Sequence, residues 1–340
     1  MYAGQSSVAT SHVAGVWGIV KGKGSDFVIQ APSPLTRKIK ILKIQQKETK
    51  MQNLNELLNL AKLAAIKAGD EIMKFYAHKG FDDEILAARS TLSESVCGKN
   101  GRDFEVNLKT DSSPVTSADL AANAAIFETL KSSQIQICSE EKILGESART
   151  FWLIDPLDGT KDFIAGSGEF CVCIALIEDG RPVLGVIYVP VTGEIYSAAK
   201  GEQTQKELYK NGSFIPQTLA AKERAPQTII SGKRGKNVTA GKLAAALNLD
   251  IARLSSAIKY CRIAENLAGA YMRYSPSSIW DNAAGEMIAA GAGAKMIDLA
   301  TLKAPIYDAA SLKNNEFIVI AKDFLAREDE ILRAIKELNL

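Results

Sequence analysis

Two aspartates three positions apart stand in the part of this sequence that is best suited to chemistry. They belong to the segment Trp152-Leu153-Ile154-Asp155-Pro156-Leu157-Asp158-Gly159-Thr160. Its apolar start predicts a buried strand that stops at Asp155, because Pro156 has no N–H with which to continue a sheet ladder. Gly159 and Thr160 follow, where the free amides of a new helix could begin. Carboxylates and free amides at one strand end suit a divalent metal ion and a phosphate group.

An acidic surface turn ahead of a capped helix is the alternative interpretation of this segment. Further carboxylates at the ends of other predicted elements favour the metal site. Asp119 lies in the first turn of a predicted helix, where favourable interaction with the helix dipole is its simplest role. Glu140 and Glu141 end a predicted strand that starts at Ile135. Asp281 is a candidate N-cap of a later helix.

These motifs resemble those of the inositol monophosphatase superfamily, which are Mg2+-dependent and Li+-sensitive phosphatases. The resemblance extends from about Met51 to the C-terminus. The ending Lys161-Asp162-Phe163 is similar to that of the CysQ-type branch, which removes the 3′-phosphate of adenosine 3′,5′-bisphosphate. Plain inositol monophosphatases more often have Thr-Asn-Phe there. Two more motifs are similar to that branch, namely Ser255-Ser256-Ala257-Ile258-Lys259-Tyr260-Cys261 and Trp280-Asp281-Asn282-Ala283-Ala284-Gly285.

The resemblance implies a role for each candidate residue of the site. Two Mg2+ ions, with a third and weaker one, would be held by Glu140, Asp155, the carbonyl of Leu157, Asp158 and Asp281. Asp119 and Thr160 would orient a metal-activated water for in-line attack on phosphorus and take its proton. Glu141 and Lys161 would support the metal site from outside the set of direct ligands. The substrate would be bound by Gly159, Thr160, Ser256, Lys259, Arg273 and Asp281.

The implied activity is that of a 3′(2′),5′-bisphosphate nucleotidase, a phosphoric monoester hydrolase of sulfur metabolism and nucleotide recycling that releases AMP and phosphate. One Lys and one Arg converging on an acidic pocket suit a bisphosphate, although each alone could be a solvated surface charge. The branch often has a Ser-Arg-Ser-His run where this chain has Ser231-Gly232-Lys233-Arg234, so that contact differs in detail. An inositol or other sugar phosphatase is the alternative enzyme. A catalytically silent binding protein is the alternative outside enzymes.

Helices and antiparallel strands must position these residues. Apolar residues at three- and four-residue spacing predict a helix from Asn53 to about Lys79, and a second helix runs from Thr116 or Ser117 to Ser132. Strands from Phe170 to Ala199, with a hairpin turn at Asp179-Gly180, predict an antiparallel meander and argue against a doubly wound nucleotide fold. By resemblance the fold is α+β, a layered α/β/α/β/α sugar-phosphatase fold with largely antiparallel sheets. A last helix is predicted for residues 323–340.

The domain organisation follows from composition and from the extent of the resemblance. Residues 1–50 are rich in Lys and Arg and predict a disordered or non-native extension rather than a targeting signal. Residues 51–340 form the phosphatase domain, with a metal-binding half at 51–200 and a substrate-binding half at 201–340. Residues 81–107 predict an inserted loop near the site entrance or a plain surface excursion.

The composition of the chain limits which binding partners and metal ions can be expected. The 340 residues carry a net charge of +2, with 46% hydrophobic and 24% charged residues, which gives no case for nucleic acid and is typical of a globular cytoplasmic enzyme. No run is apolar and long enough to predict an integral membrane span, while peripheral membrane association stays open, as does the choice between monomer and homodimer. The five cysteines predict small buried hydrophobes rather than disulfides or zinc ligands, and Cys171 and Cys173 should face the same way. With only two histidines, any metal should be hard and bound by oxygen.

Overall fold

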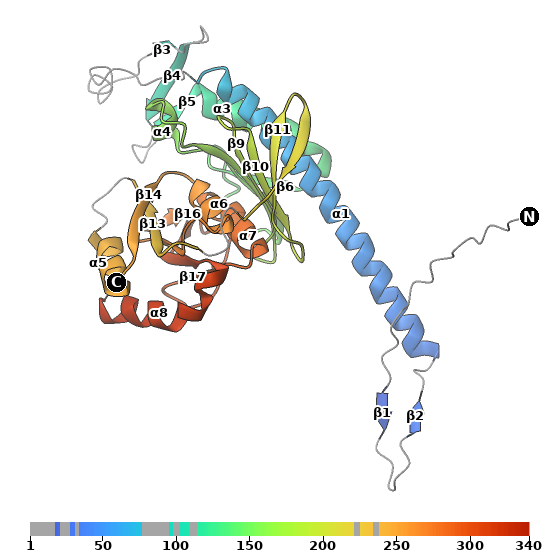
Figure 1. Ribbon diagram of the computed structural model, residues 1–340. Helices are drawn as coiled ribbons and strands as arrows, with labels where there is room; N and C mark the ends of the chain where they lie inside the picture. Colours follow the sequence, from blue (N-terminus) through green and yellow to red (C-terminus); the bar gives the residue numbers. More distant parts are fainter. Residues whose placement is uncertain are drawn as a thin grey trace, which may run out of the picture. The chain divides into compact units, whose positions relative to one another are not determined.

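The computed structural model describes residues 18–20, 28–30, 34–76, 95–97, 103–108, 114–220, 225–233 and 238–339, and of these the side chains from 53 onward except at 95–115. The chain divides into two compact units, Met1–Asn53 and Leu54–Leu340. The first unit contains an antiparallel pair, β1 (Gly18–Val20) and β2 (Val28–Gln30), and the start of helix α1 (Pro34–Met73) (Figure 1). The helix expected from Asn53 therefore begins at Pro34. The loop predicted at 81–107 lies largely outside the described residues.

A seven-stranded sheet is the centre of the second unit (Figure 1). It has the order β12-β11-β10-β9-β8-β7-β6. All neighbours are antiparallel except β6 and β7, so the predicted meander is confirmed. At the β8–β9 hairpin, Asp179 and Gly180 have φ of 51° and 73°, the positive values that a type I′ turn requires. The bounds are β6 Gln136–Ser139, β7 Thr150–Asp158, β8 Cys171–Glu178, β9 Arg181–Val189, β10 Glu194–Ala199, β11 Gln205–Lys210 and β12 Ser213–Gln217.

A mixed five-stranded sheet has the order β14-β13-β15-β19-β17. Its bounds are β13 Thr228–Gly232, β14 Asp250–Leu254, β15 Ala270–Arg273, β17 Lys295–Asp298 and β19 Phe317–Ile320. The remaining strands are short, namely β3 Ser95–Cys97, β4 Asp103–Leu108, β5 Pro114–Thr116, β16 Ser277–Ser278 and β18 Lys313–Asn314. The helices are α3 Ser117–Leu130, α4 Thr160–Ile164, α5 Val238–Leu247, α6 Ile258–Ala264, α7 Ala283–Gly291 and α8 Glu328–Glu337.

The alternation of side chains along β7 divides the interior into two cores. Trp152 and Ile154 face the core that α1 and α3 cover. Phe151 and Leu153 face the other core, which also holds α6, α7, the five-stranded sheet, α5 and α8. Since successive residues of a strand point to opposite faces, one fully buried strand serves both cores. The layers are thus α1 and α3, the large sheet, α6 and α7, the smaller sheet, and α5 and α8, which confirms the predicted layered fold.

Strand β7 does not end at Pro156 as predicted. It continues to Asp158, with Asp155 opposite Cys173 and Asp158 opposite Cys171, so that Pro156 and Leu157 together face one residue of β8. This β-bulge takes the proline out of the ladder, where its missing N–H costs no hydrogen bond. The strand therefore delivers both aspartates to the same edge of the sheet.

Two helix starts also differ from the prediction. Asp281 is not an N-cap but ends a 3-10 turn, η2 (Ile279–Asp281), and Asn282 precedes α7 without a side-chain cap bond. The Asn282 side chain instead binds Tyr260 and Asn314, at 3.0 and 2.9 Å. The last helix begins as a 3-10 turn, η3 (Lys322–Arg327), before α8. Among the described residues, no helix has both the length and the apolar character that a membrane span requires.

Contact between α7 and β9 requires a glycine, which leads to a stability prediction. A Cβ on Gly185 would lie 2.7 Å from the carbonyl oxygen of Ala284 and 2.9 Å from the Met287 side chain. Gly185→Ala should therefore lower the free energy of unfolding by about 1 to 3 kcal/mol, the usual cost of overpacking. Chemical denaturation measures this change.

The matched control is Gly241→Ala in α5, where the nearest atom to the new Cβ is 4.0 Å away. That change should be neutral or should stabilise by up to about 1 kcal/mol, because alanine favours helices. Equal destabilisation by both changes would contradict the packing argument.

Candidate active site

Four carboxylates from three parts of the chain lie close together near the end of strand β7. Asp155 and Asp158 come from the bulged end of β7, Glu140 from the residue after β6, and Asp281 from the turn before α7. Asp155 is only 2% exposed and Asp158 and Asp281 are partly buried. The Asp155 carboxylate also accepts a hydrogen bond of 3.0 Å from the Leu157 amide across the bulge.

Burial and repulsion from neighbouring carboxylates raise the pKa values of Asp155, Asp158 and Asp281. Burial, followed by the charges of Glu140, Asp158 and Asp281, holds the pKa of Asp155 well above its ordinary value. Burial, followed by Asp158 and Glu140, raises the pKa of Asp281 to about 7. Such a group of carboxylates becomes fully ionised at low cost only when cations compensate it.

Asp119 and Thr160 form a hydrogen-bonded pair beside this cluster. Asp119 is the third residue of α3 and completes a capping box with Thr116, from which it accepts both the amide and the hydroxyl hydrogen bond. Its other oxygen accepts a bond of 3.1 Å from the Thr160 hydroxyl, which also lies 3.2 Å from the Leu157 carbonyl oxygen. Burial raises the pKa of Asp119 to about 7. The helix-capping and the chemical interpretation of Asp119 are thus compatible.

The opposite wall of the pocket is basic. Lys259 and Arg273 line it together with Asp158 and Asp281. Lys259 is 6% exposed, its ammonium donates to the Ser256 carbonyl, and burial lowers its pKa despite the attraction of Asp158. An acidic half and a basic half in one pocket can hold metal ions and the anion that those ions bind.

The backbone around the pocket is held in unusual conformations. Gly159 has φ of +99°, and a Cβ there would lie 2.8 Å from the Glu169 carbonyl oxygen, so that only glycine fits. Ser256, a non-glycine residue, has φ of +53°. The next amide, of Ala257, donates a hydrogen bond to Asp158. The two chain segments therefore meet at Asp158.

The residues present fit a divalent metal ion. The donor set consists of carboxylates and the Leu157 carbonyl, which are the oxygen ligands that Mg2+ prefers. Burial, followed by the charges of neighbouring carboxylates, raises the pKa values of Asp155 and Asp281. A bound cation would relieve that repulsion.

The structure does not bring every candidate residue into the pocket. Lys161 is exposed on α4 and does not line it, and the Glu141 amide binds the Ser139 hydroxyl at the end of β6. Arg234 lies outside the described residues. The position of Asp162 in the pocket lining was not anticipated, although it stands inside a motif that was recognised.

Glu169 is a further residue that the sequence argument missed. Its carboxylate accepts a hydrogen bond of 2.9 Å from the Ser255 amide and pairs with Lys233. It thereby joins the loop before β8 to the segment that carries Lys259. No local sequence pattern marks Glu169 as part of the site, because its partners are more than 60 positions away in the chain.

Fold and site together define a phosphatase class in which clustered carboxylates bind metal beside a basic anion pocket. A sequence model of the Inositol monophosphatase family matches residues 53–336. The chain belongs to this family, and it is an enzyme, a phosphatase of that family.

Relatives named for their activity extend the comparison. Over 201 residues the chain is 39% identical to the 3′(2′),5′-bisphosphate nucleotidase CysQ of Escherichia coli K12, which covers 57% of this chain and 80% of that protein. Identity to the protein of the same name from Aggregatibacter actinomycetemcomitans is 33% over 236 residues, or 66% and 86% of the two chains. The crystal structure of CysQ from Bacteroides thetaiotaomicron matches with a TM-score of 0.63 at 30% identity and covers 78% and 97%.

The raised carboxylate pKa values predict how stability depends on pH. Between about pH 4 and pH 7 the unfolded chain releases protons that folded Asp119 and Asp281 retain, so the metal-free protein should lose stability as pH rises. If Mg2+ is bound by the deprotonated groups, it should stabilise the protein more at about pH 8 than at about pH 5.5. Thermal unfolding with EDTA and with Mg2+ at both pH values measures this.

Asp281→Asn provides the control, since it should reduce both the loss of stability with pH and the effect of Mg2+. An Mg2+ effect of the same size at both pH values would show that these carboxylates do not form the site.

Proposed function

We propose that this protein is a Mg2+-dependent 3′(2′),5′-bisphosphate nucleotidase, which hydrolyses the 3′-phosphate of adenosine 3′,5′-bisphosphate to AMP and phosphate. The observation that carries the proposal is a pocket in which Asp158 and Asp281 face Lys259 and Arg273, while Asp155 and Glu140 lie close enough to interact electrostatically with both aspartates. The identity of 33 to 39% to curated CysQ proteins supports the nucleotide as substrate.

Glu140, Asp155, Asp158, Asp281 and the Leu157 carbonyl would hold two Mg2+ ions, with a weaker third. When bound, such ions activate water and neutralise charge on the phosphoryl group. Residues of the chain would orient the attacking water and accept its proton. The Thr160 hydroxyl, fixed by Asp119 and Leu157, orients the attacking water, and the Asp119 oxygen that binds Thr160 takes its proton.

The basic wall would bind the substrate. Lys259, Arg273 and the Ser256–Ala257 segment face the metal-binding side of the pocket, where the reacting phosphate would lie. Lys233 lies at the same pocket and is exposed, which suits the second phosphate of a bisphosphate. The four described cysteines are free and buried, which supports a reducing compartment, the cytoplasm. We propose a monomer or homodimer.

Phosphate release in the presence of Mg2+ tests the substrate, with adenosine 3′,5′-bisphosphate and inositol 1-phosphate measured side by side. A large preference for the nucleotide, lost in Asp158→Asn, is expected. Preference for inositol 1-phosphate would support the proposed site but contradict the proposed substrate, and would indicate an inositol monophosphatase. No release from either substrate by a folded, Mg2+-binding protein would instead indicate a binding protein.

The Asp119–Thr160 pair leads to a separate prediction. Asp119→Asn removes the proton acceptor and should lower kcat by about 10^2 to 10^4-fold. Thr160→Val removes the hydroxyl at nearly constant shape and should lower kcat more than it changes KM. Steady-state kinetics on the nucleotide measures both.

Thr160→Ser is the matched control, because it keeps the hydroxyl and should retain most of the activity. If Thr160→Val and Thr160→Ser were equally active, the hydroxyl would have no role in orienting water.

A further inference from the structure

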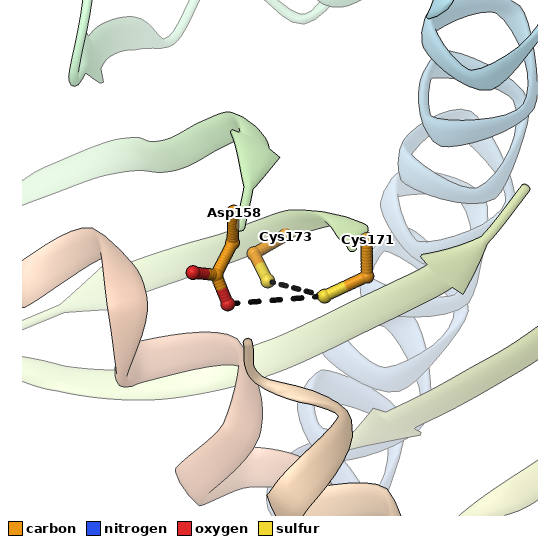
Figure 2. Close-up of side chains that lie close together, drawn as sticks. All are labelled: Asp158, Cys171 and Cys173. Atoms are coloured by element: carbon orange, nitrogen blue, oxygen red, sulfur yellow. Dashed lines mark hydrogen bonds between the residues drawn. The ribbon is translucent and has the colours of Figure 1, made fainter. Parts of the chain in front are cut away.

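Two buried thiols lie beside Asp158, which lines the pocket. Cys171 and Cys173 alternate with Val172 on β8, so both point to the same face of the sheet, as predicted from sequence. Their sulfur atoms are 3.8 Å apart, and the Cys171 sulfur is 3.9 Å from one Asp158 carboxylate oxygen. Figure 2 shows the three side chains converging from two neighbouring strands. Both thiols are almost fully buried, with 0% and 1% exposure.

The β7 bulge creates this arrangement. It places Asp158 opposite Cys171, whereas Asp155 pairs with Cys173. The Asp158 carboxylate therefore contacts two regions, the pocket and the pair of thiols. It lines the phosphate pocket, and one of its oxygens also lies next to the sulfur pair.

The sulfur–sulfur separation matches tetrahedral zinc coordination, and the sulfur–oxygen separation is close to it. Two sulfur atoms that are each about 2.3 Å from one tetrahedral ion lie about 3.8 Å apart, and a sulfur and a carboxylate oxygen lie about 3.5 Å apart. The observed separations are 3.8 and 3.9 Å. One ligand atom from each residue lies within 4.8 Å of the other two. Side-chain movement that draws the Asp158 oxygen toward the two sulfur atoms would complete the geometry needed to bind an ion.

We propose that Asp158, Cys171 and Cys173 form a binding site for a thiophilic divalent cation such as Zn2+ or Cd2+. Binding displaces the two thiol protons to solvent and leaves a fourth position open for water or a phosphate oxygen. The sequence argument placed these cysteines among buried hydrophobes. That interpretation holds for Cys138 and Cys261, which the structure does not group with such a set of ligands.

A functional consequence rests on the proposed Mg2+ role of Asp158. Mg2+ prefers oxygen ligands, whereas thiolates select softer ions. An ion held by both thiols withdraws Asp158 from the oxygen site, so the two metals exclude each other. Thiophilic cations would thus inhibit the enzyme in competition with Mg2+.

Cadmium titration of the reduced full-length protein tests the site without any activity assay. Sulfur-to-cadmium charge-transfer absorption in the ultraviolet should rise and saturate at about one equivalent. Cys173→Ala and Cys171→Ala should each weaken binding by more than tenfold, since loss of an outer partner alone typically costs 10- to 100-fold. Cys261→Ala, another buried free thiol, is the matched control and should leave the titration unchanged.

All proteins carry Cys97→Ala, so that the remaining thiols are those at the four described positions. Absence of the absorption at one equivalent, or its persistence in Cys171→Ala and Cys173→Ala, would overturn the proposal. If these variants fail to fold, as judged by circular dichroism, the protein with both thiols still provides a test. Excess Mg2+ should raise its half-saturating Cd2+ concentration, and a titration that Mg2+ does not shift would refute the shared use of Asp158.

Phosphate release by the same protein then separates this inference from the proposed function. Inhibition by micromolar Zn2+ that excess Mg2+ reverses is expected, and inhibition independent of Mg2+ would contradict the competition. If no phosphate is released from any substrate, the proposed function fails, while the cadmium absorption still decides whether the site exists.

Discussion

Repulsion between carboxylates with little access to water is the constraint on which this structure depends. Asp155 and Asp158 end strand β7, and Asp281 lies more than a hundred residues further along the chain; burial and the charges of neighbouring carboxylates raise the pKa values of Asp155 and Asp281. A fold that only had to be stable would avoid such a cluster, because each buried charge requires compensation. Its presence indicates that a cation belongs to the working state of the molecule.

The surrounding elements hold the cluster in place against this repulsion. The β7 bulge directs two aspartates to one edge, and Gly159 allows the chain to turn beside Glu169, where a larger residue would not fit. Lys259 and the Ala257 amide offset part of the charge of Asp158. Packing of α6 and α7 between the two sheets fixes these partners, which explains why a glycine such as Gly185 matters at a distance from the chemistry.

Asp158 lies between hard oxygen donors and soft sulfur donors. On one side are the carboxylates that we propose as Mg2+ ligands, and on the other are the thiols of Cys171 and Cys173. Because one carboxylate has both kinds of neighbour, geometry and the ions available, rather than affinity alone, would determine which metal ion it binds. The thiols lie on the core face of the sheet, so their packing role and their closeness to the site coexist.

Local patterns in the sequence were sufficient to predict the meander, the hairpin turn at Asp179-Gly180 and a helix capped by Thr116 or Ser117. These features depend on residues close together in the chain, where alternation, turn chemistry and capping act. The resemblance of a few motifs supplied the layered fold and the family. Only the tertiary structure decided that β7 passes Pro156 through a bulge, that Asp281 lies in a turn before Asn282 rather than capping α7, and that Glu169 and Cys171 adjoin the site. Each of these depends on contacts between distant segments, and the energies of such contacts leave no periodic trace in the sequence.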